Sequence, residues 1–298
     1  MRSKDLAGKK RFSSDFVSLR LHTQSTAIAE KRYALWERFL ELIVCEKEFT
    51  PERYDRFDEP PKNVFDCRDI SEPIKILSLL GEKPIFERYK PYYLFYNLNT
   101  GHINPAAPIN FEGLTVEAEY FKSYEKCEQF LNFSKKMYWI FNPLYGYIAQ
   151  DYDRNNQNRI YTYFPPGHPN AGSVASMKGF GGDIRKGIPG VYWANFFSKI
   201  YIDTIGRDKF LTAPCYRREE LSGGGFLLLT SESPLDWQKP EVQELRKAMR
   251  EHLGYEYFCD INNRDRICKV PEFDFSVWEK ECDYGMKIPE RLKISPQT

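Results

Sequence analysis

The stretch from Gly187 to Trp237 constrains the fold more than any other part of this 298-residue chain. It opens with a Pro-Gly turn signal and the apolar, aromatic run VYWANFF, followed by two short helical segments separated by Gly206. The extended segment PCYRREEL, the turn Ser222–Gly225 and the apolar run FLLLT come next. Because glycine reaches positive φ without steric cost, the SGGG turn predicts a hairpin. This order predicts one half of an antiparallel α+β fold.

Five other stretches carry helix signals. Ser25–Cys45 has apolar residues at helical spacing with charges on the opposite face. Ser71 precedes a proline and is predicted to be the N-cap of a short helix, Ser123 is predicted to cap a helix through Ile140, and Thr50–Glu52 is predicted to open another short helix. Pro240–Leu253 begins with proline and is followed by a glycine, so it predicts a regular helix.

The remaining apolar segments predict strands at 91–98, 113–121 and 145–149, and a docked or edge strand at 271–278. Residues 1–20 are polar and predicted to be poorly ordered unless they dock onto the rest of the fold. The fold class is α+β, with antiparallel sheets and packed helices, in which two related halves are conceivable. The predicted parts are a helical N-terminal region (1–90), a first α+β half (91–150), a loop or linker (151–187), and a second α+β half with a C-terminal tail (188–298).

Composition disfavours several classes of partner and compartment. The 43 Lys and Arg residues nearly balance the 42 Asp and Glu residues, so no global field attracts nucleic acid or an anionic membrane. No apolar run approaches the roughly 18 residues of a transmembrane helix. The seven cysteines are scattered and form no C-x-x-C pair, which argues against a disulfide framework or a zinc ribbon. We therefore expect reduced thiols and a cytoplasmic location.

The sequence contains no clear catalytic, cofactor or metal motif. The four histidines lack metal-ligand spacing, no G-x-S-x-G motif is present, and the glycines at 179–182 lack the lysine of a phosphate-binding loop. Carboxylate pairs such as Asp151 with Asp153, or Glu219 with Glu220, are common on solvated surfaces. We therefore predict no catalytic residue, no cofactor and no metal ligand.

Several short motifs resemble a known family. They are Trp193-Ala194-Asn195-Phe196, Ile205-Gly206, Ala213-Pro214, Glu220-Leu221-Ser222-Gly223-Gly224, Ser233-Pro234-Leu235-Asp236 and the turn Asn142-Pro143-Leu144-Tyr145-Gly146. Together they resemble the bacterial immunity proteins of the immunity protein 52 family and the related type VI secretion immunity family. The resemblance spans residues 110–255, whereas the first 90 residues and the tail match neither family.

The resemblance implies a cytoplasmic protein, not an enzyme, that binds and neutralises a cognate bacterial toxin, a polymorphic or type VI secretion effector, by occluding it. The matched motifs would then define the fold, and loops would contact the toxin. The loop residues with the acidic and aromatic mixture favoured at interface hot spots are Asp151, Tyr152, Asp153, Tyr161, Tyr163 and Phe164.

Two alternatives belong to other functional classes. A carboxylate-dependent hydrolase or transferase would bring acids together in a deep pocket and shift their pKa values. A scaffold or DNA-associated protein would carry a localised basic face. The sequence alone does not decide among the three.

Overall fold

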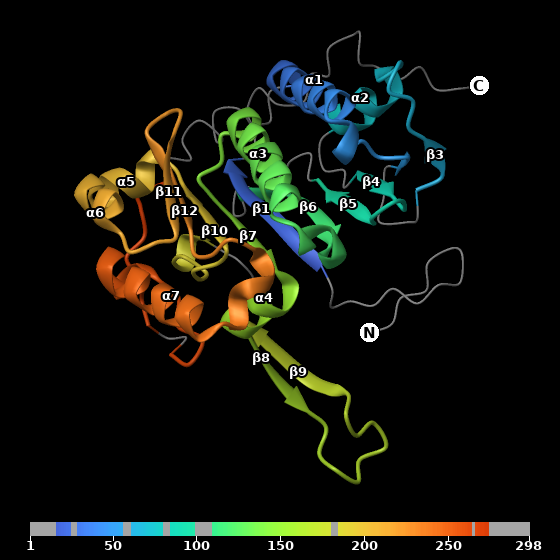
Figure 1. Ribbon diagram of the computed structural model, residues 1–298. Coiled ribbons are helices and arrows are strands. Elements are labelled where there is room, and N and C mark those ends of the chain that lie inside the picture. Colours follow the sequence, from blue (N-terminus) through green and yellow to red (C-terminus); the bar gives the residue numbers. More distant parts are fainter. Residues whose placement is uncertain are drawn as a thin grey trace. The chain divides into compact units, whose positions relative to one another are not determined.

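The computed structural model (Figure 1) describes residues 16–24, 29–55, 61–79, 84–98, 109–179, 184–263 and 266–273. The chain divides into two compact units. Ile148–Glu272 form the second unit, and the described residues before Ile148 form nearly all of the described first. Both units combine helices with antiparallel strands, which confirms the α+β class that the sequence predicts.

Within the described ranges, the first unit contains three α-helices and six whole strands. Its helices are α1 (Ala29–Cys45), α2 (Ser71–Ser78) and α3 (Tyr124–Phe141), with 3-10 turns at Lys47–Phe49 and Ala118–Lys122. Its strands are β1 (Phe16–Gln24), β2 (Arg53–Asp55), β3 (Asn63–Val64), β4 (Ile85–Arg88), β5 (Leu94–Asn97) and β6 (Ile109–Glu117). Strand β7 (Tyr145–Gln150) crosses the boundary between the units. The strands of the first unit follow the order β1-β6-β5-β4-β2-β3.

A row of large apolar side chains crosses this sheet in register. Leu19 of β1 lies opposite Leu114 of β6, which lies opposite Tyr96 of β5. The row continues through Phe86 of β4 to Tyr54 of β2. Directly opposed residues share a face of the sheet. All five side chains are buried, so this face forms the core of the first unit.

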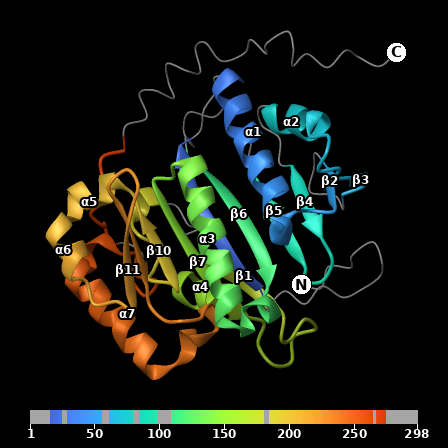
Figure 2. The ribbon, with the colours of Figure 1, turned by 45° about the horizontal axis from the view of Figure 1, so that its top comes forward.

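Helices α1 and α3 cover that face (Figures 1 and 2). The Phe39 ring of α1 lies 5.5 Å from the Tyr96 ring and 5.7 Å from the Phe141 ring of α3. Phe49, just after α1, stacks on Phe133 of α3 at 4.2 Å and accepts a 2.7 Å hydrogen bond from the Tyr96 hydroxyl through its carbonyl oxygen. Burying each phenylalanine stabilises the fold by about 1.5–3 kcal/mol, so aromatic contacts hold both helices on the sheet.

The N-terminal region differs from its prediction as a helical segment. Strand β1 begins at Phe16, within the residues predicted to be poorly ordered, and its Val17, Leu19 and Leu21 are fully buried. The predicted short helix at Thr50–Glu52 is replaced by strand β2, which starts at Arg53. Both strands are stabilised by pairing with distant segments, a contribution that local sequence patterns do not contain.

The predicted helices α1, α2, α3 and α7 are present, with one change in capping. Ser123 is the N-cap of α3, as predicted, and its side chain accepts a hydrogen bond from the Lys126 amide. Ser71, by contrast, is the first residue of α2 rather than its N-cap. The Ser71 amide donates a 2.9 Å hydrogen bond to Asp69 Oδ1. An aspartate two residues earlier therefore satisfies the first helical N–H group.

The described part of the second unit contains four α-helices and two groups of strands. Its helices are α4 (Asp151–Asn158), α5 (Lys199–Ile205), α6 (Arg207–Thr212) and α7 (Pro240–Leu253), with 3-10 turns at Ile184–Lys186, Pro234–Gln238 and Tyr255–Tyr257. Its strands are β8 (Arg159–Tyr163), β9 (Val174–Gly179), β10 (Ala194–Phe197), β11 (Arg217–Leu221) and β12 (Gly225–Leu229). Strand β12 pairs with β10 on one side and β11 on the other, and β8 pairs with β9.

The motif Trp193-Ala194-Asn195-Phe196 lies in the core of this unit. All four residues are fully buried. The Trp193 Nε1 group donates a 3.0 Å hydrogen bond to the Ser231 carbonyl, and Asn195 Nδ2 donates to the Tyr192 carbonyl at 2.9 Å. These bonds satisfy the buried polar atoms that an apolar core would otherwise leave without partners. The spacing of the motif thus has a structural explanation in packing and hydrogen bonding.

The predicted linker contains regular structure, and the predicted C-terminal strand lies mostly outside the described ranges. Residues 151–187, predicted as a loop or linker, contain helix α4 and the β8–β9 hairpin. The predicted strand at 271–278 is described only to Phe273, where no regular element is assigned, and its other residues lie outside the described ranges. None of the helices that the structure describes has the length and apolar character needed to cross a membrane.

Candidate interaction site on α4 and the β8–β9 hairpin

Helix α4 begins at a side-chain cap that sorts its first residues into exposed and buried positions. Gln150 Oε1 accepts hydrogen bonds from the amides of Tyr152, at 3.0 Å, and Asp153, at 3.4 Å. The cap satisfies N–H groups that lack partners within the helix. Tyr152 consequently faces outward and is 48% exposed, whereas Asp153 faces inward and is only 2% exposed.

Asp153 forms a buried ion pair with Arg246 of α7. Arg246 Nη1 and Nη2 donate to Asp153 Oδ1 and Oδ2, both at 2.9 Å, and Gln157 Nε2 donates to Oδ1 at 2.8 Å. Burial raises the pKa of the Asp153 carboxyl group, and the charge of Arg246 opposes that rise. A bidentate contact of this geometry is that of an ionised pair. It joins α4 to α7.

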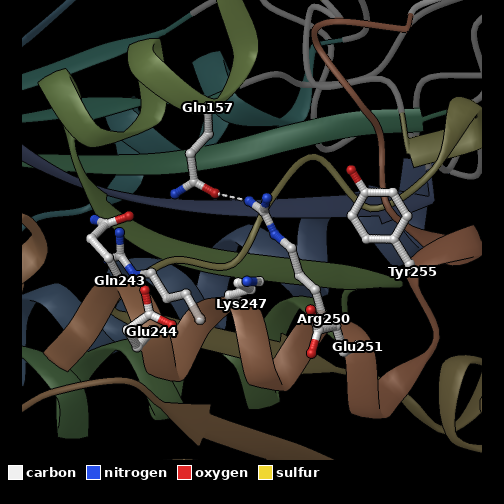
Figure 3. A pocket seen from close by; sticks show the side chains of 8 residues that line it. Gln157, Gln243, Glu244, Lys247, Arg250, Glu251 and Tyr255 are labelled. Carbon is white, nitrogen blue, oxygen red and sulfur yellow. Dashed lines mark hydrogen bonds between the residues drawn. The ribbon is translucent and has the colours of Figure 1, made fainter. Parts of the chain in front are cut away.

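A pocket of about 470 Å³ lies along α7 beside this ion pair (Figure 3). Its walls carry mostly polar and charged side chains: Gln157, Gln243, Glu244, Arg246, Lys247, Arg250, Glu251 and Tyr255. Arg250 reaches across the pocket and donates a hydrogen bond to Gln157 Oε1. Burial lowers the pKa of Arg250, but a guanidinium group stays protonated in proteins. The pocket therefore holds a permanent positive charge.

The β8–β9 hairpin continues from α4 and extends away from α4 and α7 (Figure 1). Alternation along β8 places Tyr161 and Tyr163 on one face, with ring centroids 6.4 Å apart. Val174 of β9 pairs with Tyr163 and therefore shares that face. Tyr163 is 57% exposed and Val174 is 45% exposed. The hairpin thus presents aromatic and apolar surface to solvent.

The tip of the hairpin consists of consecutive hydrogen-bonded turns. The His168 amide donates to the Pro165 carbonyl at 3.2 Å, and the Ala171 amide donates to the His168 carbonyl at 2.8 Å. Gly167 adopts a φ of 90°, a conformation that side chains other than glycine rarely reach. The Phe164 ring stacks on His168 at 4.3 Å. These contacts define the conformation of the tip.

The structure separates the six residues predicted to contact a partner. Tyr161 and Tyr163 come together on the hairpin, Phe164 lies at the start of its tip, and Tyr152 is exposed on α4. Asp151 is mostly covered and lies 3.4 Å from Arg154. Asp153 is buried in its pair with Arg246, so its carboxylate is not on the surface. The exposed members of the predicted set are aromatic rather than acidic.

Sequence reasoning did not identify Arg246 and Arg250. A signal for Arg246 was present, because it occupies the buried stripe of α7 between the apolar residues Val242 and Met249. A charged residue in such a stripe indicates a buried partner of opposite charge. Within the described ranges, no three His, Cys, Asp or Glu side chains converge in a way that could hold a metal ion.

Comparisons with known proteins add little to this geometry. No protein-family model matches the chain. No curated protein matches it either. A solved structure of a type VI secretion system (T6SS) protein from Pseudomonas aeruginosa is distantly similar, at 11% identity and a TM-score of 0.44, with 88% of each chain covered. A likeness this remote carries no argument about what the present chain binds or does.

Proposed function

We propose that this protein is an immunity-type binding protein that neutralises a cognate bacterial toxin by covering part of its surface. The β8–β9 hairpin is the proposed contact, and the observation that supports it most is the face that carries the half-buried Tyr161 and the exposed Tyr163 and Val174. The proposal follows the resemblance of the buried core motifs to immunity proteins, and it places the protein in the cytoplasm with its toxin.

The composition of the hairpin suits a protein partner. From Ile160 to Met177 the sequence contains no Asp, Glu, Lys or Arg. It combines two tyrosines with serine, glycine and asparagine, the residue types that antibody loops use to bind proteins. Tyrosine contributes large contact area at a low entropic cost. A projecting hairpin whose residues 160–177 carry no Asp, Glu, Lys or Arg fits a concave and weakly charged surface, such as the active-site cleft of a toxin.

The carboxylate-dependent enzyme alternative receives less support. Asp151 and Asp153 each pair with a different arginine, Arg154 and Arg246. The two glutamates of β11 also pair with different arginines. Glu219 lies 3.1 Å from Arg217. Glu220 lies 2.8 Å from Arg207. An acid–base or nucleophilic pair needs two carboxylates that converge on one substrate. These contacts favour binding over catalysis.

The proposal is tested with the full chain, tagged and captured from the lysate of its native cell. The wild type is compared with a Tyr161→Ser/Tyr163→Ser variant and with Trp139→Ser as the matched control. Trp139 lies on α3 in the first unit and is 66% exposed, so its replacement removes exposed aromatic surface outside the unit that contains the hairpin. The captured partner is then expressed alone in a test host and again together with each variant.

We expect a partner that is toxic when expressed alone, and growth that the wild type and Trp139→Ser restore. The hairpin variant should retain its fold but fail to restore growth. A toxic partner that the hairpin variant neutralises as well as the wild type would leave immunity standing and reject the hairpin as the contact. A captured protein without toxicity would reject the immunity function itself.

A further inference from the structure

We propose that the pocket along α7 binds an oxyanion, the carboxylate or phosphate group of a small ligand, through Arg250 and Lys247. The proposal is independent of toxin binding by the hairpin. The pocket volume of about 470 Å³ lies in the range of small-molecule sites, roughly 300–1,000 Å³. Asp153 acts on Arg250 through its charge without contacting it. The ligand would supply the direct ion-pair partner that Arg250 lacks among the described residues.

Arg250 has a neutral partner where a charged one would be expected. Its Nη2 group donates to the amide oxygen of Gln157, and no carboxylate lies within ion-pairing distance of it among the described residues. A guanidinium group carries five N–H donors in a planar fork that matches a carboxylate or a phosphate. Most of these donors therefore remain available to a ligand in the pocket.

Hydrogen bonds hold the side-chain amide of Gln157 in one orientation. Its Oε1 also accepts from the Val191 amide at 3.1 Å, and its Nε2 donates to Asp153 Oδ1 at 2.8 Å and to the Val191 carbonyl at 2.9 Å. The side-chain amide thus uses both its donors and both acceptor positions. This network fixes Gln157 and, through it, directs the Arg250 guanidinium across the pocket (Figure 3).

The charge of Arg246 is neutralised by Asp153, which leaves Arg250 and Lys247 as the cations that face the pocket. Lys247 forms no ion pair within the described ranges and lies between Arg250 and Gln243 in Figure 3. A lysine and an arginine around one cavity attract an anionic group. Burial of Arg250 strengthens this attraction, because water screens a buried charge less.

Two acidic side chains limit what the pocket accepts. Glu244 and Glu251 also line it, but both residues are exposed, and in Figure 3 they remain beside α7 while Arg250 reaches toward Gln157. With Asp153, they balance the three basic side chains of the site. A polyanion such as a nucleic acid would extend over Glu244 and Glu251, whose negative charges repel it. A small ligand that presents an oxyanion group to Arg250 and Lys247 fits this arrangement.

The test is a pair of NMR titrations of the full chain, one with inorganic phosphate and one with succinate, at constant ionic strength. Arg250→Gln removes the charge and retains a polar side chain. Arg207→Gln is the control, since Arg207 pairs with Glu220 on the exposed surface and does not line the pocket. Lys247→Gln is a second probe, because its exposed side chain can be replaced with little risk to folding.

We expect saturable binding of at least one anion, weakened about tenfold or more by Arg250→Gln, which corresponds to about 1.4 kcal/mol. Lys247→Gln should weaken binding less, and Arg207→Gln should leave it unchanged. Binding of phosphate alone would assign a phosphate ligand, and binding of succinate alone a carboxylate. Absence of saturable binding, or equal binding by wild type, Arg250→Gln and Lys247→Gln, would overturn the proposal.

Discussion

Arg246 and Asp153 form a bidentate ion pair that is almost completely buried, with both N–O distances at 2.9 Å and side-chain exposures of 5% and 2%. The pair joins α7 to α4, and α4 leads directly into β8. It therefore holds the base of the hairpin that carries Tyr161 and the exposed Tyr163. A contact between residues 93 positions apart thus positions the proposed binding surface.

We predict that Asp153→Asn destabilises the protein strongly. Removing one partner of a buried pair leaves the other charge without compensation, which costs about 3–5 kcal/mol. Urea unfolding measures the loss. The double variant Asp153→Leu/Arg246→Met should recover much of it, because it buries no unpaired charge.

The exposed pair Arg207 and Glu220 provides the control. Its atoms lie 2.8 Å apart, but about half of each side chain is exposed. Such surface pairs contribute about 0–1 kcal/mol, so Glu220→Gln should change the free energy of unfolding little. Equal effects of Asp153→Asn and Glu220→Gln would contradict the structural role assigned to the buried pair.

The start of α2 gives a second prediction. Asp69→Ala removes the acceptor of the Ser71 amide and of the Ser71 side chain. Loss of a helix cap of this kind should lower the unfolding temperature by about 2–4 °C. Ser71→Ala keeps the bond from its amide to Asp69 and should have a smaller effect. A larger effect of Ser71→Ala, measured by thermal unfolding, would restore the serine to the capping role that the sequence predicts.

The contact between Asp69 and Ser71 should also make the stability of the protein depend on pH in the acidic range. The hydrogen bonds from Ser71 lower the pKa of Asp69. A carboxyl group with a lowered pKa in the folded state stabilises the protein above its unfolded pKa, near 3.9, and this contribution disappears as the pH falls through the folded pKa. The stability difference between the wild type and Asp69→Ala should therefore shrink below about pH 4. A stability difference between the wild type and Asp69→Ala that stays constant as the pH falls would contradict this prediction.

Tyr138 of α3 gives a prediction at alkaline pH. Burial raises its pKa from 10.0 to about 12. The folded state then keeps a proton that the unfolded state releases, so stability is complete below about pH 10 and falls as the pH rises toward 12. One such group contributes up to about 1.4 kcal/mol for each pH unit. Tyr138→Phe should reduce the slope in urea unfolding between about pH 10 and about pH 11. An unchanged slope would show that Tyr138 ionises alike in both states.

Local signals in the sequence predicted the elements whose causes are local. The SGGG turn joins β11 to β12, the serine at 123 caps α3, and Pro240 begins α7. Each depends on backbone preferences within a few residues. The separation of α5 from α6 at Gly206 follows from the same kind of signal, with a φ of 107° at that glycine.

Elements whose causes are distant were not predicted. Strand β1 contains Ser18, which is buried. Its hydroxyl has a hydrogen-bond partner because the Thr115 hydroxyl, 97 residues away along the chain, lies 3.0 Å from it. Helix α4 consists largely of asparagine and aspartate, which are poor helix formers. It forms because Gln150 caps it and Arg246 pairs with Asp153. The predicted partner-binding set shares this limit, since only three-dimensional contacts show that Asp153 is buried.

The most direct test of the central claim is hydrogen exchange of the full chain, alone and with its toxic partner. We predict slower hydrogen exchange in peptides from the β8–β9 hairpin, 159–179, when the partner is bound. Peptides from α1, 29–45, should exchange at the same rate in both states and serve as the internal control. Unchanged exchange across the hairpin, together with protection elsewhere in the chain, would contradict the claim that this hairpin is the toxin-binding surface.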